Sequence, residues 1–123
     1  MSGVAPVTRE VTQAGVAAYA DASGDHNPIH VDEAFARGTP FGGTIAHGML
    51  VLALIGEMMH EAFGEQWLAS GRLKVRFKAP ARPGQALTAS AEAPVSAGGD
   101  YAVRVTDAAG ETLVEGRASL ERA

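Results

Sequence analysis

The chain has 123 residues, of which 46% are hydrophobic and 20% are charged, and its formal net charge is -4. This composition is typical of a globular protein and excludes a disordered one, and the length suits one domain over residues 1–123. The small negative charge argues against nucleic acid or an anionic membrane as a partner. The chain contains no cysteine, which excludes disulfides, a thiolate nucleophile and thiolate-bound metals.

The size of the chain and its first residues lead to two further expectations. A domain this small leaves much of its surface uncovered when it folds alone, so we expect a homodimer. The stretch MSGVAPVTREVTQAG lacks the basic region followed by an apolar region that marks a secretory signal. We therefore expect a cytoplasmic protein, and no apolar stretch is long enough to predict a membrane span.

The first part of the chain is predicted to hold short elements. Residues 4–11 have the composition of an extended segment, and Thr12 can cap a helix that ends at Gly24. Asn27 followed by Pro28 is typical of the cap and the first position of another short helix. These elements are too brief to supply a core.

The middle of the chain holds the longest predicted element. Asp32 can cap a further turn, after which residues 37–44 contain three glycines and a proline and are expected to form a loop. Residues 45–63 are apolar almost all round, and Gly64 follows as a stop signal. We expect a helix here that is buried on most sides.

The remaining residues show the alternation of β-strands. Residues 71–80 alternate apolar and basic side chains, which indicates a strand with one buried face. Three further strands are predicted over residues 85–95, 100–107 and 111–121, separated by SAGG and AAG at hairpin spacing. An apolar helix followed by an antiparallel meander predicts an α+β fold, with the sheet wrapped around one long central helix.

The stretch ASGDHNPIHVDEAF gathers four polar side chains around Pro28, namely Asp25, His26, Asn27 and His30. The spacing of the two histidines would suit a metal-ligand pair on a helix. However, Pro28 fits only the first turn of a helix and leaves His26 outside it, so we expect no metal site. Because Asp, Asn and Pro also form turns, these residues alone leave open both a reactive site and a plain chain reversal.

The stretch TIAHGM opens the long helix and contains His47 and Gly48. Free backbone N–H groups at the start of a helix lie at the positive end of its dipole, which suits a carbonyl oxygen that gathers negative charge. Close packing of the helix explains the glycine equally well. Gly48 is therefore a candidate for an oxyanion contact rather than an assigned one.

Together these stretches resemble the MaoC-like (R)-specific enoyl-CoA hydratases and the related 3-hydroxyacyl thioester dehydratases. The resemblance rests on YADASGDHNPIHVDEAFA at residues 19–36 and TIAHGMLVLALIG at residues 44–56, and it extends through RLKVRFKAPARPG to Gly84. It implies a hotdog fold, usually as a dimer whose sheets join edge to edge. It also implies an acyl thioester substrate and no cofactor, since coenzyme A or pantetheine enters as part of the substrate.

By position in the motif, the resemblance gives the catalytic roles to Asp25 and His30. A carboxylate and an imidazole that flank one water can add it to a trans-2-enoyl thioester or carry out the reverse dehydration. Asn27 and Pro28 are interpreted as supports that fix the turn presenting both groups, and His47 as a hydrogen-bonded supporting residue.

Two other functions stay open for a chain of this kind. One is a thioesterase, because thioesterases also use hotdog folds and acyl thioesters. The other is an acyl-binding subunit of a heteromeric dehydratase, although an intact Asp25 and His30 argue against it. Gly56 is a departure, since some members of the family place a hydroxyl residue near that turn of the helix. We expect His26 to be exposed and non-catalytic, and we assign no role to His60.

Overall fold

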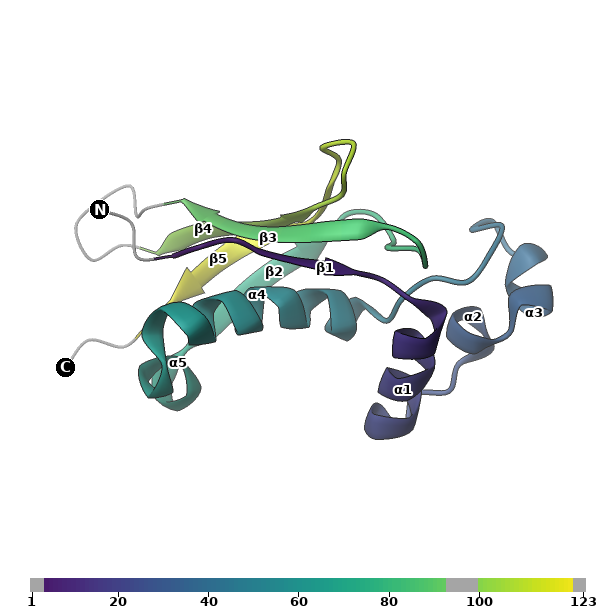
Figure 1. Cartoon of the computed structure of the whole chain (residues 1–123), viewed down its shortest axis with the longest axis horizontal. Coiled ribbons are helices and arrows are strands. Elements are labelled where there is room, and N and C mark those ends of the chain that lie inside the picture. The colour runs from purple at the N-terminus through teal and green to yellow at the C-terminus, as the bar shows by residue number, and fades with distance from the viewer. Residues whose placement is uncertain (1–3, 93–99, 121–123) are drawn as a thin grey trace.

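The computed structural model describes residues 4–92 and 100–120 of the chain. Within them, one sheet contains β1 (Val7–Glu10), β2 (Arg72–Phe77), β3 (Ala86–Glu92), β4 (Tyr101–Thr106) and β5 (Thr112–Ser119). The helices are α1 (Gln13–Ser23), α2 (Pro28–Val31), α3 (Glu33–Arg37), α4 (Gly48–Phe63) and α5 (Glu65–Ser70). Figure 1 shows α4 along one face of the sheet, with α1, α2 and α3 beyond its N-terminal end. The predicted α+β arrangement around one long helix is confirmed.

The sheet is antiparallel, with the strand order β1-β3-β4-β5-β2. Strands β3, β4 and β5 form the predicted meander, but β2 pairs with β5 and not with its successor β3. The expectation of one continuous meander is therefore wrong at β2. The connection from β2 to β3 crosses to the other edge, where β3 pairs with β1, so the two strands that flank the helices in sequence lie at opposite edges.

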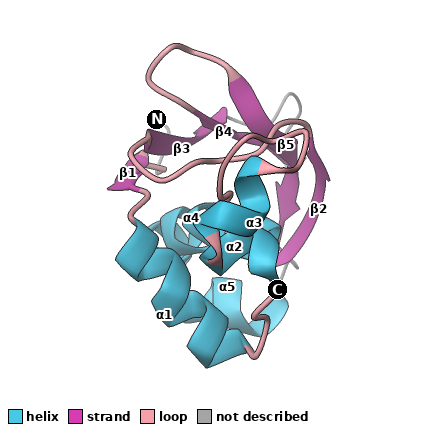
Figure 2. Ribbon diagram, turned by 90° about the vertical axis from the view of Figure 1, so that its right-hand side faces the viewer, coloured by secondary structure: helices cyan, strands magenta, loops and turns pink. Residues whose placement is uncertain are grey.

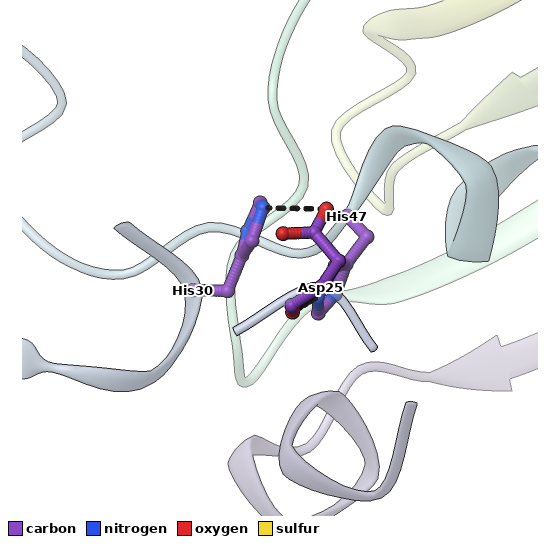
Figure 3. A group of neighbouring side chains, drawn as sticks. All are labelled: Asp25, His30 and His47. Carbon is purple, nitrogen blue, oxygen red and sulfur yellow. Dashed lines mark hydrogen bonds and ion pairs between the residues drawn. The ribbon is translucent and has the colours of Figure 1, made fainter. Parts of the chain in front are cut away.

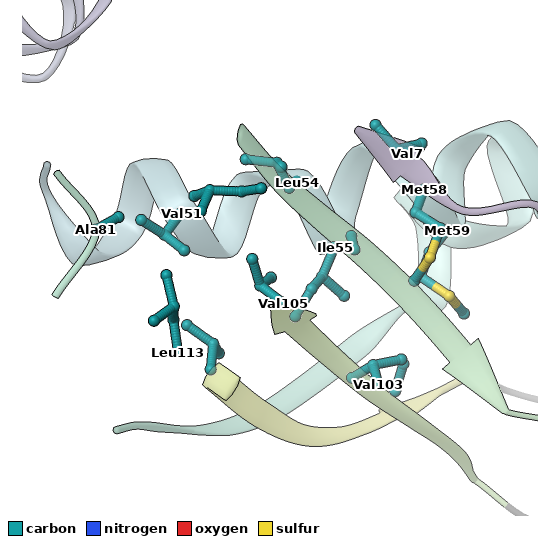
Figure 4. Packing of buried hydrophobic residues seen from close by; sticks show 14 of the residues in the cluster. Val7, Val51, Leu54, Ile55, Met58, Met59, Ala81, Val103, Val105 and Leu113 are labelled. Atoms are coloured by element: carbon teal, nitrogen blue, oxygen red, sulfur yellow. The ribbon is translucent and has the colours of Figure 1, made fainter. Parts of the chain in front are cut away.

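The core lies between α4 and the inner face of the sheet. Ile55, Met58 and Met59 of α4 have no exposed surface, and Figure 4 shows them on the side of the helix that faces the strands. Val103 and Val105 of β4 are likewise buried and supply the opposite side of this core. Burial of apolar side chains from both layers is the main force that holds the helix on the sheet.

Helix α4 begins at Gly48, later than the predicted start at Ile45. The N–H of Ile45 donates to the carbonyl of Ile29 at 3.1 Å, and that of Ala46 donates to the carbonyl of Ala81 at 2.8 Å. These two residues therefore bond to segments outside the helix and do not join it. The late start places the first turn of α4 beside α2.

Helix α4 is buried or half-buried over most of its residues, as expected, and one side of it is open. Met49 is 58% exposed, and Ala53, one helical turn further, is also exposed. An apolar helix face without cover in the single chain is a surface suited to another protein surface. No helix within the described ranges combines the length and the apolar character needed to cross a membrane.

Local signals set the ends of the short helices as predicted. The Thr12 hydroxyl accepts a hydrogen bond from the N–H of Gly15 at 2.9 Å, and Gly24 ends α1 with a φ of 80°. Asp32 caps α3, its carboxylate accepting from the N–H of Phe35 at 3.1 Å. Helix α5 had no counterpart among the predicted elements.

The two predicted hairpin turns have different outcomes. The AAG turn is confirmed, since Gly110 has a φ of 89° and its N–H donates to the carbonyl of Asp107 at 3.0 Å. The SAGG turn lies outside the described residues, as do the ends of the strands predicted over residues 85–95 and 111–121.

Candidate active site

The turn after α1 presents Asp25. Gly24 adopts the left-handed conformation that glycine takes without strain and directs the chain toward α2. Carboxylate oxygen Oδ1 of Asp25 accepts a hydrogen bond from the N–H of Asn27 at 3.2 Å. This bond orients the carboxylate, whose side chain remains 54% exposed. Oxygen Oδ2 is left to face His30.

Helix α2 carries His30, and the sequence before it sets the direction of the helix. Asn27 caps α2 by accepting from the N–H of Ile29 at 3.0 Å, and Pro28 occupies its first position. The His30 side chain is 12% exposed, and its Nδ1 lies 2.8 Å from the carbonyl oxygen of Ile45. Because a carbonyl only accepts, Nδ1 carries the hydrogen, and Nε2 of the neutral ring has a free lone pair.

The structure brings the two predicted catalytic side chains together. Nε2 of His30 lies 3.9 Å from Oδ2 of Asp25, and Figure 3 shows the two groups facing each other. This distance is longer than a direct hydrogen bond of about 3.2 Å at most. Both atoms are acceptors in the unprotonated state, so one water molecule can donate a hydrogen to each of them. The pair is thus arranged for chemistry on a small hydroxylic molecule.

His47 lies behind this pair and is only 3% exposed. Its Nε2 is 2.9 Å from the backbone carbonyl oxygen of Asp25. Its ring stacks on the ring of His30, with the centroids 3.8 Å apart and an interplanar angle of 24°. His47 is thus buried and hydrogen-bonded, and its supporting role stays a prediction.

Gly48 begins α4 beside a cavity. Its N–H has no hydrogen-bond acceptor among the described residues, whereas the N–H groups of Leu50 and Val51 both donate to the carbonyl of His47. The cavity has a volume of about 300 Å³, and Gly48 and Phe77 both line it. A Cβ added at Gly48 would lie 3.1 Å from Cε1 of Phe77. The free N–H of Gly48 therefore borders the cavity, and a side chain at position 48 would narrow it.

The remaining histidines lie apart from this centre. Nε2 of His26 is 2.9 Å from Oδ1 of Asp21, and the His26 side chain is 57% exposed. His60 is exposed on α4. His26 and His30 therefore do not form the ligand pair that their spacing would allow on a continuous helix.

A different set of three side chains comes close enough to suggest a cation. One ligand atom each from Asp25, His30 and His47 lie within 4.8 Å of one another. However, the two rings are stacked, so their in-plane lone pairs run side by side and do not converge on one point as tetrahedral ligands do. One nitrogen of each ring also faces a backbone carbonyl. The geometry suits proton transfer better than metal binding.

Sequence reasoning missed Gln13, which ties α2 to the segment before α4. Its amide Nε2 donates to the carbonyl of His30 at 2.9 Å, and its Oε1 accepts from the hydroxyl of the buried Thr44 at 2.8 Å. Figure 2 shows the helices α1, α2 and α3 gathered in front of α4. No local spacing links Gln13 to His30, so only the fold reveals the contact.

The antiparallel sheet around one central helix defines a hotdog fold, which this chain shares with solved R-hydratases. Residues 3–114 match the model of the MaoC like domain, and the chain belongs to this family. The solved structure of the (R)-hydratase from A. caviae superposes with a TM-score of 0.77 and 28% identity, covering 95% of this chain and 93% of that chain. An R-hydratase from Pseudomonas aeruginosa gives a TM-score of 0.78 and 29% identity, covering 94% of this chain and 77% of that one.

Curated relatives carry related names. The 3-hydroxyacyl-thioester dehydratase Z of Mycobacterium tuberculosis is 42% identical over 84 residues, which cover 65% of this chain and 56% of that protein. The (R)-specific enoyl-CoA hydratase of Aeromonas caviae is 36% identical over 92 residues, covering 72% of this chain and 66% of that protein. The chain therefore spans little more than half the length of the mycobacterial relative.

Proposed function

We propose that the protein hydrates trans-2-enoyl thioesters to (R)-3-hydroxyacyl thioesters, or carries out the reverse dehydration, with Asp25 and His30 acting on one water molecule. The observation that carries the proposal is the 3.9 Å approach of Oδ2 of Asp25 to Nε2 of His30, two proton acceptors that face each other. The names of the relatives, a dehydratase of hydroxyacyl thioesters and a hydratase of enoyl-CoA, support the substrate class.

The proposed reaction moves one proton through the pair. As the water oxygen forms a bond to C3, one of the two groups takes a proton from the water, and the C2–C3 π electrons shift toward the thioester carbonyl. C2 then receives a proton from the pair, and the oxygen keeps its other hydrogen. The pair returns to its starting protonation state. Because both groups flank the same water, both additions occur on one face of the double bond.

The amide of Gly48 is our candidate for stabilising the negative charge on the carbonyl oxygen. It is the first N–H of α4, has no acceptor among the described residues and borders the cavity. An N–H at this end of a helix also benefits from the helix dipole. Coenzyme A or pantetheine would be part of the substrate, and no separate cofactor is needed for this chemistry.

The open face of α4 supports a homodimer as the working form. Met49 on this face and Phe77 at the end of β2 are 58% and 51% exposed, and Phe77 lines the cavity beside Gly48. Large apolar side chains at a cavity mouth are stabilised when a second protein surface covers them. A second copy joined along the β2 edge would cover this side of the molecule.

One assay that follows both the enoyl absorbance and the release of free thiol tests the proposed activity against its alternatives. With crotonyl-CoA as substrate, a hydratase removes the enoyl absorbance without releasing free thiol. A thioesterase instead releases thiol from the same compound, and an acyl-binding subunit without a catalytic partner changes neither signal. Loss of enoyl absorbance by the purified protein alone is the expected result; thiol release or no change contradicts the proposal.

A further inference from the structure

His47 contacts or adjoins three helices, of which α1 and α4 contribute to the core whereas α2 contributes no buried residue. It precedes the first turn of α4, and its ring lies between the rings of Tyr19 on α1 and His30 on α2. The Tyr19 ring meets it edge-on at 4.8 Å and 62°, and the His30 ring lies parallel to it at 3.8 Å. Edge-on and offset-stacked arrangements of this kind are favourable beyond the burial of the ring area.

The position of the short helix α2 depends on the contact between His30 and His47. It has four residues and none of them is buried in the core. Ile29 and His30 are its half-buried residues, and the flat side of the His30 ring rests on His47. The orientation of the His30 ring, and with it the direction of the Nε2 lone pair, is set by the stacking and by the hydrogen bond to the Ile45 carbonyl.

The hydrogen bonds of the two stacked rings assign them opposite tautomers. Nδ1 of His30 faces a carbonyl and carries its hydrogen, as described above. In His47 it is Nε2 that faces a carbonyl, that of Asp25, so Nε2 is the donor. Nδ1 of His47 is buried without a hydrogen-bond partner among the described residues. A hydrogen on that atom would be a buried donor without a partner, which is unfavourable, so these contacts favour the Nε2–H tautomer of His47.

We propose that His47 is a positioning residue that holds both members of the pair through two independent contacts. Its Nε2–H holds the backbone carbonyl of Asp25, and its ring face holds the ring of His30. The inference rests on the proposed function, since it deepens the account of the same site. It gives His47 no proton to transfer, because its one donor is used by a carbonyl and its other nitrogen is enclosed.

Two substitutions separate the contacts. His47→Gln keeps a side-chain N–H donor and removes the stacked ring, whereas His47→Phe keeps a flat ring and removes the donor. We expect each to lower kcat by between about 10- and 100-fold with KM unchanged, because small displacements of a reacting pair have effects of this size. A change confined to KM, or a kcat equal to that of the parent protein in both variants, overturns the proposal.

A coupling measurement separates positioning from loss of structure. Residues that act as one unit have strongly non-additive effects, so His47→Phe should slow the reaction much less in an Asp25→Asn background than in the parent protein. If the reduction in kcat of the double variant equalled the product of the two single reductions, His47 would act independently of Asp25. This result would contradict the proposal. Circular dichroism of each variant gives the folded fraction by which kcat is corrected.

A second measurement needs neither a variant nor activity. Long-range ¹⁵N–¹H spectra of the unmodified protein identify which ring nitrogen carries the hydrogen in each histidine. We expect a protonated Nε2 in His47 and a protonated Nδ1 in His30. A protonated Nδ1 in His47 contradicts the proposal even if the enzyme is an active hydratase. The expected tautomers in an inactive protein would instead contradict the proposed function alone.

Discussion

His30→Ala is expected to lower hydration of crotonyl-CoA by about 100-fold or more, since removal of a positioned general acid or base has an effect of at least this size. The substitution deletes the Nε2 lone pair that faces Asp25 and also the ring that rests on His47. Most of the His30 side chain is covered but lies outside the main core, so the sheet and α4 should remain folded. The measurement is kcat/KM from the loss of enoyl absorbance.

His26→Ala is the matched control for this variant. His26 belongs to the same motif, is 57% exposed and contacts Asp21 rather than the reacting pair. We expect its kcat/KM to equal that of the parent protein. If both variants kept full activity, or lost it equally while folded, the role proposed for His30 would be wrong.

Gly116→Ala is expected to destabilise the protein by about 3 kcal/mol or more, through overpacking against the backbone of β2. Gly116 lies in β5 opposite Val75 of β2 and Val103 of β4. A Cβ added there would lie 2.0 Å from the carbonyl oxygen of Lys74 and 2.7 Å from the Cα of Val75. Relief requires β2 to move away from β5. Urea unfolding followed by circular dichroism measures the change in the free energy of unfolding.

Gly56→Ala gives the opposite expectation at a glycine within α4. A Cβ at Gly56 meets no atom within 4 Å, and alanine favours a helix over glycine by about 1 kcal/mol. This variant should therefore be as stable as the parent protein or slightly more so. Equal destabilisation by the two substitutions would contradict the described register of β2 and β5.

The parts of the site that were predictable from sequence are those set by neighbouring residues. Asn27 and Pro28 specify the start of α2 by capping chemistry, and Gly24 specifies the end of α1. These signals act over a few positions, so they can be read without knowing the fold. They also place Asp25 and His30 at the two ends of one short turn. The structure confirms that these two residues lie close together, whereas their catalytic roles stay predictions.

The contacts that needed the structure join residues far apart in the chain. The stacking of His30 on His47, the bond from Gln13 to the carbonyl of His30 and the pairing of β2 with β5 all depend on tertiary packing. The late start of α4 at Gly48 has the same origin, because backbone bonds to distant segments outweigh the apolar character of Ile45 and Ala46. The hydrophobic periodicity of a segment indicates which element it can form. Its tertiary contacts determine at which residue that element begins.

The stereochemistry of hydration in D₂O tests most directly whether Asp25 and His30 act together on one water molecule. The product formed from crotonyl-CoA is isolated, and its proton NMR coupling between C2 and C3 gives the relative placement of the deuteron and the hydroxyl. We predict a single diastereomer with both groups added to the same face and the (R) configuration at C3. Addition to opposite faces, or a mixture at C2, would contradict the account, since the proton would then come from a group elsewhere.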